Sequence, residues 1–374
     1  MEFRQSSLEG LEMNPRFWCK RKVLLVGHTG FKGSWLSLWL ESLGAEVVGY
    51  SLPPPTQPSL FVLAEVGKGM ESIRGDVLDL EHLRRVVREH RPDIVFHLAA
   101  QSLVRRSYLD PVGTYATNVL GTVHILEAVR DAPTVQAVIV VTSDKCYENR
   151  EDHRAYRETD RLGGLDPYSS SKACAEVVIA AFRKSFFTGT KRETTASVAS
   201  VRAGNVIGGG DWAADRLIPD VMRAALEGRR LLIRSPHAVR PWQHVLNPLC
   251  GYLMLAEKLC EEPERFSGSW NFGPEESEML PVSSVLERLS VLWGPGVLWR
   301  FDGGPHLHEA QYLKLDCTKA KTELGWEPQW NLNSALEAIV QWYKAQQLHQ
   351  DVRSLTLQQI RSYQTALNQP INAR

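Results

Sequence analysis

The 374-residue sequence has few features that would direct it to a metal, a membrane or a nucleic acid. Its six cysteines, at positions 19, 146, 174, 250, 260 and 317, form no Cys-x-x-Cys pair, which argues against a zinc site or a redox dithiol. Basic and acidic residues both number 43, so no net charge attracts the chain to nucleic acid or to a membrane surface. The longest apolar runs have the length of a strand and are too short to span a membrane. The polar N-terminal stretch contains no apolar signal core, so we expect a cytoplasmic protein.

The sequence has instead a regular alternation of short β-branched runs and helical patterns. Strands are predicted at residues 23–26, 45–51, 71–77, 92–100 and 136–143, and helices at 35–43, 79–90, 113–131 and 168–187. Strands that alternate with helices indicate a parallel sheet covered on both faces. The predicted fold is therefore α/β, a Rossmann-type doubly wound sheet.

After residue 198 the pattern changes to short helices and loops rich in Gly, Pro and Trp, which predicts a smaller α/β lobe for the substrate. We expect this lobe to be interleaved with the first. The predicted division is a flexible extension at 1–20, a dinucleotide-binding lobe at 21–198 plus about 241–265, a substrate lobe at about 199–240 plus 266–347, and a polar tail at 348–374 that is expected as a loosely packed helix.

A glycine-rich turn separates the first predicted strand from the first helix. Gly27, Gly30 and Gly33 allow a tight turn and a close approach of the backbone to a pyrophosphate at the helix start. A purely structural turn is the alternative. The second strand ends in Tyr50 and Ser51, with neither the acid nor the arginine that would distinguish NAD from NADP, so that choice stays open here.

Tyr168 and Lys172 lie one helical turn apart and share a helix face. A tyrosine is a poor base at neutral pH, but a neighbouring ammonium and an oxidised nicotinamide both favour its phenolate. The pair is therefore predicted to accept a hydroxyl proton while a hydride leaves for the cofactor. The alternative is an ordinary surface helix.

These motifs together resemble the extended short-chain dehydrogenase/reductase family, also described as NAD-dependent epimerases and dehydratases. The resemblance is carried by "GHTGFKG", "HLAAQS", "TSDK" and "YSSSK", and covers nearly the whole chain from about Met13. Longer strings such as "GYSLPPPTQPSLF" and "RAGNVIGGGDWAADRLIPD" are similar to the branch that dehydrates CDP-glucose. The resemblance implies a nucleotide-sugar substrate, NAD as cofactor, and a homodimer or a dimer of dimers. In this family two helices per subunit form the interface, here those carrying Thr114 to Arg130 and Tyr168 to Phe187.

The resemblance also assigns ligand-binding positions. The expected cofactor contacts are Gly27, Thr29, Gly30, Phe31, Lys32, Gly33, Ser51, Asp76, Val77, Leu98, Ala99, Ala100, Tyr168 and Lys172. The expected substrate contacts are Gln101, Ser143, Asn205, Arg216, Leu217, Arg234, Arg240, Asn271, Glu309 and Tyr312. Asp76 is expected near the adenine amino group, although a turn or helix-cap aspartate is an equally good interpretation.

Ser143, Asp144 and Lys145 follow the strand before the Tyr-Lys helix. By resemblance Ser143 shares the sugar O4 proton with Tyr168, which is all that an epimerase needs. A 4,6-dehydratase oxidises C4, removes the C5 proton, expels the C6 hydroxyl as water and returns the hydride to C6. Asp144 is the expected acid and Lys145 the expected base, which requires an unprotonated lysine. An ordinary solvated turn is the alternative, and the division of roles stays open.

Other polar residues are expected to be structural. His97 is predicted to be a satisfied core histidine and Asn118 a structural residue near the catalytic strand. His306 and His308 have no further ligands near them in the sequence, so no metal site is predicted.

Overall fold

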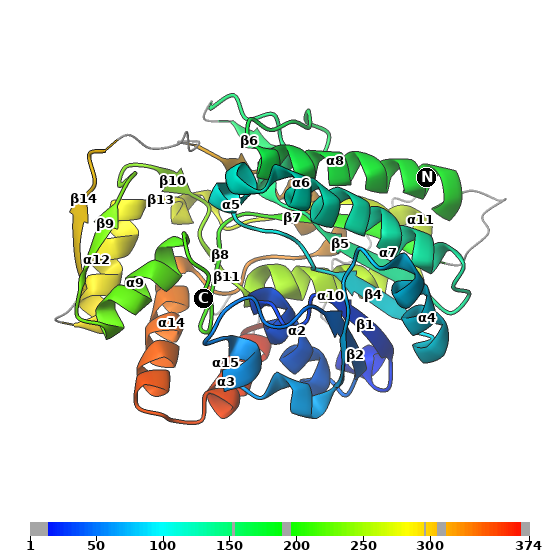
Figure 1. Ribbon diagram of the computed structural model, residues 1–374, viewed down its shortest axis with the longest axis horizontal. Coiled ribbons are helices and arrows are strands. Elements are labelled where there is room, and N and C mark those ends of the chain that lie inside the picture. Colours follow the sequence, from blue (N-terminus) through cyan, green and yellow to red (C-terminus); the bar gives the residue numbers. More distant parts are fainter. Residues whose placement is uncertain (1–13, 152–153, 189–195, 295–296, 305–311, 368–374) are drawn as a thin grey trace, which may run out of the picture.

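The computed structural model describes residues 14–151, 154–188, 196–294, 297–304 and 312–367 (Figure 1). Its centre is a seven-stranded sheet with the order β12-β7-β5-β4-β1-β2-β3, in which every neighbouring pair is parallel. The strands are β1 (Lys22–Val26), β2 (Glu46–Ser51), β3 (Glu71–Arg74), β4 (Ile94–His97), β5 (Ala137–Val141), β7 (Ser197–Ala203) and β12 (Gly268–Phe272). The predicted fold class is confirmed.

Alternate residues of each central strand face opposite sides of the sheet, and both sides are apolar. In β1, Val23 and Leu25 belong to one buried cluster, whereas Leu24 and Val26 belong to the other. The first cluster also contains α2 (Phe31–Ser42) and α10 (Leu246–Glu261), and the second contains α4 (Leu80–His90), α7 (Gly121–Arg130) and α8 (Pro167–Phe182). Burial on both faces explains why the strands are continuous apolar runs.

The helix predicted at 113–131 is divided in the structure. It consists of α6 (Pro111–Tyr115), a π-helical turn at Ala116–Leu120 and α7, and α8 likewise ends in a π-helical turn at Arg183–Phe187. The first π turn contains Asn118, whose side chain contacts the loop after β4. The short α5 (Val104–Leu109) precedes this helical segment.

The second lobe is built from small paired strands and short helices. Its strand pairs are β8 (Val206–Ile207) with β11 (Gln243–His244), β9 (Arg230–Ile233) with β14 (Leu298–Phe301), β10 (Val239–Arg240) with β13 (Leu280–Pro281), and β6 (Ala155–Tyr156) with β15 (Lys314–Leu315). Its helices include α9 (Leu217–Leu226), α12 (Val282–Trp293), α13 (Thr318–Leu324) and α14 (Leu332–Gln347). The remaining short helices of the chain are α3 (Leu60–Leu63) and α11 (Pro263–Phe266).

The predicted lobe boundaries need correction at two places, while the tail is helical as expected. Strands β7 and β12 both belong to the central sheet, so the cofactor lobe extends beyond 198 and includes residues 268–272. Helix α1 (Pro15–Trp18) carries the fully buried Trp18, whose indole Nε1 donates to Glu257 over 2.6 Å, so the flexible extension does not reach residue 20. The predicted tail forms α15 (Val352–Leu367).

Helix α15 is not loosely packed, as the polar tail had suggested. Tyr363 is fully buried and packs edge-on against Trp39 of α2, with ring centroids 5.6 Å apart. Arg353 pairs with both carboxylate oxygens of Glu41, at 2.7 and 2.8 Å. The buried face of α15 consists of Val352, Thr356, Gln359, Ile360 and Tyr363, and these few side chains suffice to fix an otherwise polar helix.

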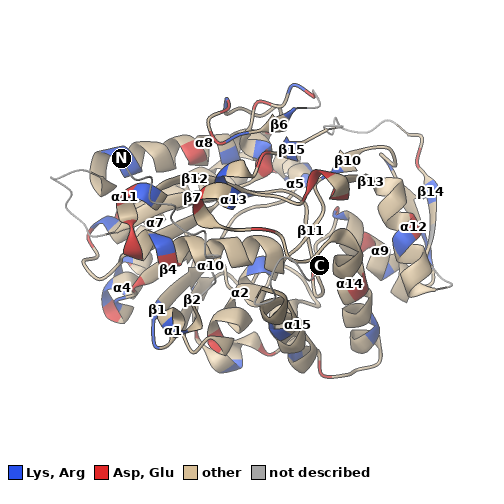
Figure 2. Ribbon diagram, turned by 180° about the vertical axis from the view of Figure 1, so that it is seen from behind, with Lys and Arg blue, Asp and Glu red and all other residues tan. Residues whose placement is uncertain are grey.

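Charged residues of both signs are distributed over the whole fold. Figure 2 shows acidic and basic positions interspersed on helices of both lobes, for example on α4 and α14. None of the described helices combines the length and the apolar character needed to cross a bilayer.

Candidate active site

The glycine turn between β1 and α2 has a backbone that only glycine fits. Gly27 has φ +96°, and a Cβ there would lie 2.5 Å from the backbone nitrogen of Ala99. A Cβ on Gly33 would lie 2.1 Å from the carbonyl oxygen of Gly27. Gly30 is the N-cap of α2 and provides no side-chain cap, so the first N–H groups of this twelve-residue helix are left for another acceptor. The turn thus fits the pyrophosphate of a dinucleotide.

The other expected cofactor positions follow the carboxyl ends of neighbouring strands. The hydroxyl of Thr29 lies 2.8 Å from that of Ser51, at the end of β2, and donates to the carbonyl oxygen of Leu52. The N–H groups of Leu98 and Ala99, after β4, both donate to Val26. Carboxyl ends of parallel strands form the ligand edge of an open α/β sheet, and the turn, the Thr29–Ser51 contact and the loop from Leu98 to Ala100 share this edge.

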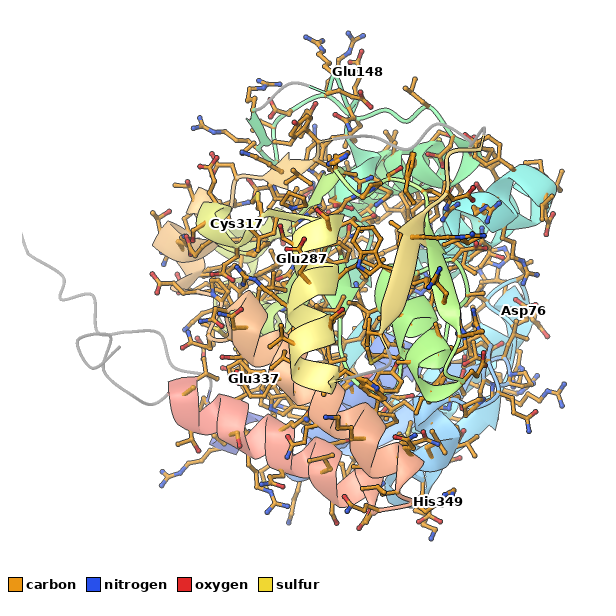
Figure 3. All side chains as sticks on the ribbon, turned by 90° about the vertical axis from the view of Figure 1, so that its left-hand side faces the viewer. Asp76, Glu148, Glu287, Cys317, Glu337 and His349 are labelled. Atoms are coloured by element: carbon orange, nitrogen blue, oxygen red, sulfur yellow. The ribbon has the colours of Figure 1, made fainter. Side chains whose placement is uncertain are left out.

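Asp76 follows β3 near Val77, which is buried. Its Oδ1 accepts a hydrogen bond from the N–H of Leu78 at 3.0 Å, and its carbonyl accepts one from the Tyr50 hydroxyl at 2.8 Å. Asp76 lies at the edge of the molecule in Figure 3. It is therefore a turn aspartate, and its proposed contact with adenine stays a prediction.

The segment after β5 brings the expected acid and base together. Ser143 is the N-cap of a 3-10 turn at Asp144–Cys146, and its hydroxyl donates to Asp144 Oδ1 at 3.1 Å and accepts from the N–H of Lys145 at 3.2 Å. Lys145 Nζ lies 3.8 Å from the same Oδ1, and 32% of its side chain is exposed. The carboxylate of Asp144 is buried, and its Oδ2 has no hydrogen-bond partner in the described part of the chain. A buried bare oxygen is costly unless a ligand group or a proton meets it.

Tyr168 and Lys172 point into the same region from α8, and both are buried. Burial raises the pKa of Tyr168 to about 12, which the hydrogen bond with Ser143 and the charge of Arg216 partly oppose. Burial also lowers the pKa of Lys172 to about 8, although Glu176 and Cys146 act in the opposite direction. Lys172 Nζ donates to the Val141 carbonyl at 3.4 Å. In the structure Ser143 and Arg216 act to lower the pKa of Tyr168, and the expected support of the phenolate by Lys172 stays a prediction.

A cluster of charges surrounds these side chains. Arg216 donates to Asp211 Oδ2 at 3.0 Å and to the Ser102 hydroxyl at 2.8 Å. Burial lowers the pKa of Lys32 to about 7, and the charges of Arg216 and Lys172 act in the same direction. Lys32 was expected only as part of the glycine turn. Asp211 was not predicted; its only signal in the sequence is its place directly after three glycines.

The remaining expected substrate contacts are distributed around this cluster. Asn205, Arg234 and Arg240 are half-buried, on the β7–β8 connection, after β9 and in β10 respectively, and Leu217 begins α9. Tyr312 is half-buried just before β15, and its carbonyl accepts from Asn149 at 3.0 Å. Glu309, His306 and His308 lie outside the described residues.

Gln101 and Asn118 hold the loop after β4. The side-chain nitrogen of Gln101 donates to the Leu103 carbonyl and to Thr114, and its oxygen accepts from the N–H of Leu103. Asn118 is buried and bonds both the N–H and the carbonyl of Gln101. Gln101 therefore shapes this loop, and its expected contact with substrate stays a prediction.

Asn271 was expected to contact substrate, but its side chain is engaged inside the protein. It is fully buried in β12, where its Oδ1 accepts from the Tyr147 hydroxyl at 2.7 Å. Its Nδ2 donates to the carbonyls of Tyr156 and Asp316, at 2.9 and 3.1 Å. Because both polar ends of the amide are engaged inside the protein, the prediction that Asn271 contacts substrate is corrected to a structural position.

His97 is buried as expected, but it is not fully satisfied. Its Nε2 lies 3.4 Å from the Thr122 hydroxyl, while its Nδ1 has no partner among the described residues. Burial and the charge of Lys172 lower its pKa to about 3, so the ring is neutral. Within the same described residues, no group of three or more His, Cys, Asp or Glu side chains is placed to hold a metal ion.

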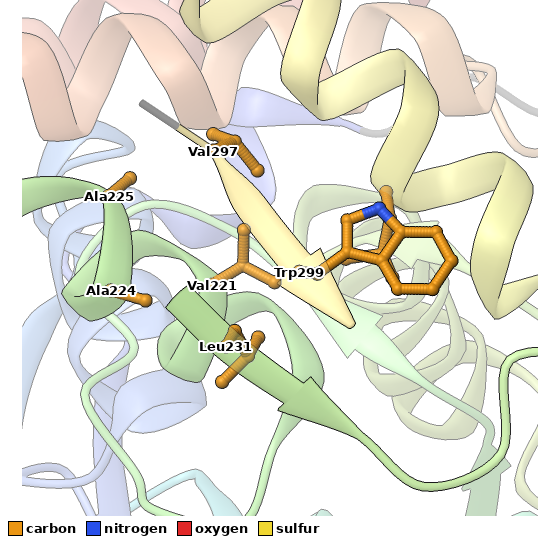
Figure 4. Close-up of a pocket in the computed structure, with 7 residues that line it drawn as sticks. Val221, Ala224, Ala225, Leu231, Val297 and Trp299 are labelled. Carbon is orange, nitrogen blue, oxygen red and sulfur yellow. The ribbon is translucent and has the colours of Figure 1, made fainter. Parts of the chain in front are cut away.

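A narrow cavity lies away from this site, within the second lobe. This cavity lies between α9, α12 and the β9–β14 pair (Figure 4), and it is lined by Val221, Ala224, Ala225, Leu231, Leu286, Val297 and Trp299. It is too narrow for a water molecule and offers no charged group. We interpret it as imperfect packing within the second lobe.

Comparisons with known proteins identify the family to which the chain belongs. Residues 23–268 match the model of the NAD dependent epimerase/dehydratase family. The chain is 50% identical over 355 residues to the CDP-glucose 4,6-dehydratase of Salmonella typhimurium strain LT2, covering 95% of this chain and 99% of that protein. The resemblance seen in the sequence is therefore confirmed.

Two solved structures share the fold. MoeE5 in complex with UDP-glucose and NAD aligns with a TM-score of 0.73 at 26% identity, covering 87% of this chain and 99% of the other. The dTDP-glucose 4,6-dehydratase of Bacillus anthracis strain Ames, in complex with NAD, aligns with a TM-score of 0.72 at 23% identity, covering 90% and 99%. With the glycine turn, the Tyr168–Lys172 helix and the family match on one chain, this protein belongs to the NAD dependent epimerase/dehydratase family.

Proposed function

We propose that the protein catalyses the NAD-dependent 4,6-dehydration of CDP-glucose to CDP-4-dehydro-6-deoxy-glucose and water. The observation that carries this proposal is the Asp144–Lys145 pair next to Ser143. An epimerase needs no further acid and base at that point, whereas elimination of water across C5 and C6 does. The choice of CDP-glucose is supported by the 50% identity to a CDP-glucose 4,6-dehydratase over nearly the whole chain.

The residues present fit a dinucleotide, because a Cβ at Gly27 or Gly33 would fill the turn and α2 begins without a side-chain cap. When bound, NAD accepts a hydride from the sugar and later returns it, so it is not consumed. Gly27, Gly30 and Gly33 would hold the pyrophosphate of NAD, and Thr29 and Ser51 would bind its adenosine half.

Proton transfers in the proposed mechanism belong to side chains of this chain. Tyr168 accepts the O4 proton, assisted by Ser143, which hydrogen-bonds to it. Lys172 holds the resulting phenolate by its charge. Lys145 then removes the C5 proton, which the new C4 ketone has made acidic. Asp144 gives its proton to the departing C6 hydroxyl, which leaves as water. Lys145, or water that exchanges with it, returns a proton to C5 once C6 has been reduced. The proton held by Tyr168 is released to solvent, and Asp144 takes one up, so that the site is restored.

We propose that Asp144 is the acid and Lys145 the base, and their surroundings support this division. Asp144 is buried, and its Oδ2 has no hydrogen-bond partner in the described part of the chain, so this oxygen is left to meet the C6 hydroxyl. Lys145 is partly exposed, so it can exchange its proton with solvent after each turnover. Arg216, Leu217, Asn205, Arg234, Arg240, Tyr312 and Glu309 are proposed to bind the nucleotide and its diphosphate.

Incubation with CDP-, dTDP-, GDP- and UDP-glucose tests the function. A 4-keto-6-deoxy product, detected by its ultraviolet absorbance in alkali without net consumption of NAD, is expected with CDP-glucose. In deuterated water the product should carry deuterium at C5. A product inverted at C4 with C5 unlabelled would show a 4-epimerase instead.

We further propose that the protein is a homodimer. Large apolar side chains are exposed on α5, α6, the adjoining π turn and α8, including Leu109 at 86%, Val112 at 80% and Val177 at 58%. Such a patch on neighbouring helices is typical of a protein–protein interface. Sedimentation equilibrium should give a dimer for the wild type and a monomer for a Val112→Glu, Val177→Glu variant. The dimer of dimers and the cytoplasmic location stay predictions.

A further inference from the structure

A buried polar network lies directly behind the end of β5. Its centre is an ion pair in which Arg202 Nη2 donates to Glu176 Oε2 at 2.7 Å, with both side chains at most 2% exposed. The same carboxylate accepts hydrogen bonds from the Thr142 hydroxyl at 2.5 Å and from the Ser200 hydroxyl at 2.7 Å. Glu176 thus joins α8 to β5 and β7 through short bonds.

This network contacts the segments that carry the proposed chemistry. Thr142 immediately precedes Ser143, so its hydroxyl fixes the first residue of the Ser143–Lys145 turn. Glu176 lies one helical turn beyond Lys172 on the same face of α8. A displacement of Glu176 would therefore move both the acid–base turn and the Tyr-Lys helix.

The network also reaches the second lobe. Arg202 Nη1 donates to the Tyr147 hydroxyl at 2.7 Å, and that hydroxyl donates to Asn271 Oδ1 at 2.7 Å. The Asn271 amide then donates to the carbonyls of Tyr156 in β6 and Asp316 after β15. A continuous chain of hydrogen bonds therefore connects the catalytic turn with the β6–β15 pair, which leads to Tyr312.

The electrostatics keep Glu176 charged. Burial alone would raise the pKa of Glu176, but the Arg202 guanidinium and the hydroxyl donors hold it below its ordinary value. The resulting carboxylate opposes the loss of charge that burial imposes on Lys172. A buried pair is often no better for stability than apolar side chains of similar size, so stability alone does not explain this pair.

We propose that Glu176 is a positioning residue, which holds the Ser143–Lys145 turn through Thr142 and couples it to the β6–β15 pair through Arg202. This inference rests on the proposed function, because the turn it positions is the proposed acid–base turn. The alternative is that the pair only contributes to folding.

Thr142 variants give the most direct test because they leave both charges in place. Thr142→Val keeps the shape and removes the hydroxyl, and Thr142→Ser keeps the hydroxyl. We expect kcat for 4-keto product formation to fall about 10-fold in Thr142→Val, with KM changed less than about threefold, because a misplaced catalytic group lowers turnover more than binding. Thr142→Ser should stay within about twofold of the wild type.

The ion pair itself is tested by Glu176→Gln and by the double variant Glu176→Gln, Arg202→Met. The single change leaves a buried unpaired arginine and can prevent folding, whereas the double change removes both charges. We expect the folded double variant to lose about 100-fold in kcat. Glu257→Gln is the matched control, since Glu257 is also a buried acid that accepts hydrogen bonds, from Trp18 and Asn14, outside the site. Its kcat should be unchanged.

The pH profile separates positioning from folding. Lys172 faces Glu176 on its own helix, Cys146 on the 3-10 turn, His97 at the end of β4 and Lys32 on α2. Loss of the Glu176 charge makes the ammonium of Lys172 easier to deprotonate. The alkaline limb of kcat should therefore move to lower pH in the double variant, and stay in place in Glu257→Gln.

Hydrogen exchange tests, independently of any reaction, whether the bond between Thr142 and Glu176 holds the Ser143–Lys145 turn. We call this connection the relay. The amides of residues 143–147 should exchange about 10-fold faster in Thr142→Val than in the wild type, because the turn is no longer held. Wild-type exchange rates together with wild-type kcat in both Thr142→Val and the double variant would overturn the relay. A wild type that makes no 4-keto product from any nucleotide glucose would instead overturn the proposed function, while the exchange rates would still decide the relay.

Discussion

Two buried carboxylates flank the end of β5, and their surroundings differ. Glu176, behind the strand, has both oxygens engaged by Arg202, Thr142 and Ser200. Asp144, in front of it, uses Oδ1 for Ser143 and Lys145 and leaves Oδ2 bare within the described structure. Both carboxylates are buried, so their difference comes from the groups around them.

The comparison indicates how this site divides its work. A fully bonded carboxylate is fixed in position and in charge, so it suits the support of other groups. A carboxylate with a bare buried oxygen can gain or lose a proton, or bind a ligand hydroxyl, at little cost to its remaining bonds. Asp144 and the turn that carries it therefore suit proton transfer, whereas Glu176 suits the positioning of other groups.

The largest expected effect is the loss of turnover when Tyr168 is replaced. Tyr168→Phe removes the proposed proton acceptor at O4 and should lower kcat by about 10³-fold or more, within the range for loss of a general base. Product formation from CDP-glucose measures it, and calorimetric titration of CDP-glucose should show binding within about threefold of the wild type. Full turnover by Tyr168→Phe would contradict the proposed mechanism.

Asp144→Asn tests whether the Asp144 carboxyl group, whose Oδ2 has no partner in the described structure, is the proton donor. The amide keeps the shape but cannot give a proton to the C6 hydroxyl, so we expect about a 10²-fold loss of dehydration. Oxidation at C4 should be affected much less, and reduced nicotinamide should accumulate in the absorbance spectrum. Glu148→Gln, on a half-exposed carboxylate of the same segment, is the control. Equal losses in both steps would assign Asp144 to C4 oxidation instead.

The charge of Lys172 gives a smaller effect that depends on pH. Its pKa is lowered to about 8, so the ammonium is present below that pH and is lost as pH rises through it. We expect kcat to fall along an alkaline limb near pH 8, by about tenfold per unit at most. Lys172→Arg should move the limb to higher pH, since an arginine stays charged. A limb at the same pH in both enzymes would assign it to another group.

The smallest expected effect is a change in stability with pH, and it comes from Glu257, which binds the N-terminal helix α1. Burial raises the pKa of Glu257 to about 7, above its ordinary 4.5. The folded state therefore binds a proton that the unfolded state has released, so this contribution to stability is complete below about pH 4.5 and is lost as pH rises to about 7. The loss is at most about 3 kcal/mol. Urea unfolding at pH 5 and pH 8 measures it, and Glu257→Gln should reduce the difference.

Much of the cofactor lobe could be predicted from local patterns. Gly27, Gly30 and Gly33 lie between a strand and a helix, and Tyr168 and Lys172 are four residues apart, so short spacings identify them. The prediction failed for Asn271, because a loop-like string gave no sign that its amide is used by Tyr147 and two carbonyls. It also failed for α15, whose polar sequence conceals a few residues that pack on α2.

The sequence by itself determined the parallel sheet, the glycine turn and the order Ser143, Asp144, Lys145, because each depends on residues close together in the chain. Only the tertiary structure decided which carboxylate is satisfied and which is bare. Glu176 and Arg202 are 26 residues apart, and Tyr147 and Asn271 are 124 apart. Such contacts depend on how strands are ordered in the sheet and how side chains pack between them, which the spacing of residues along the chain does not specify.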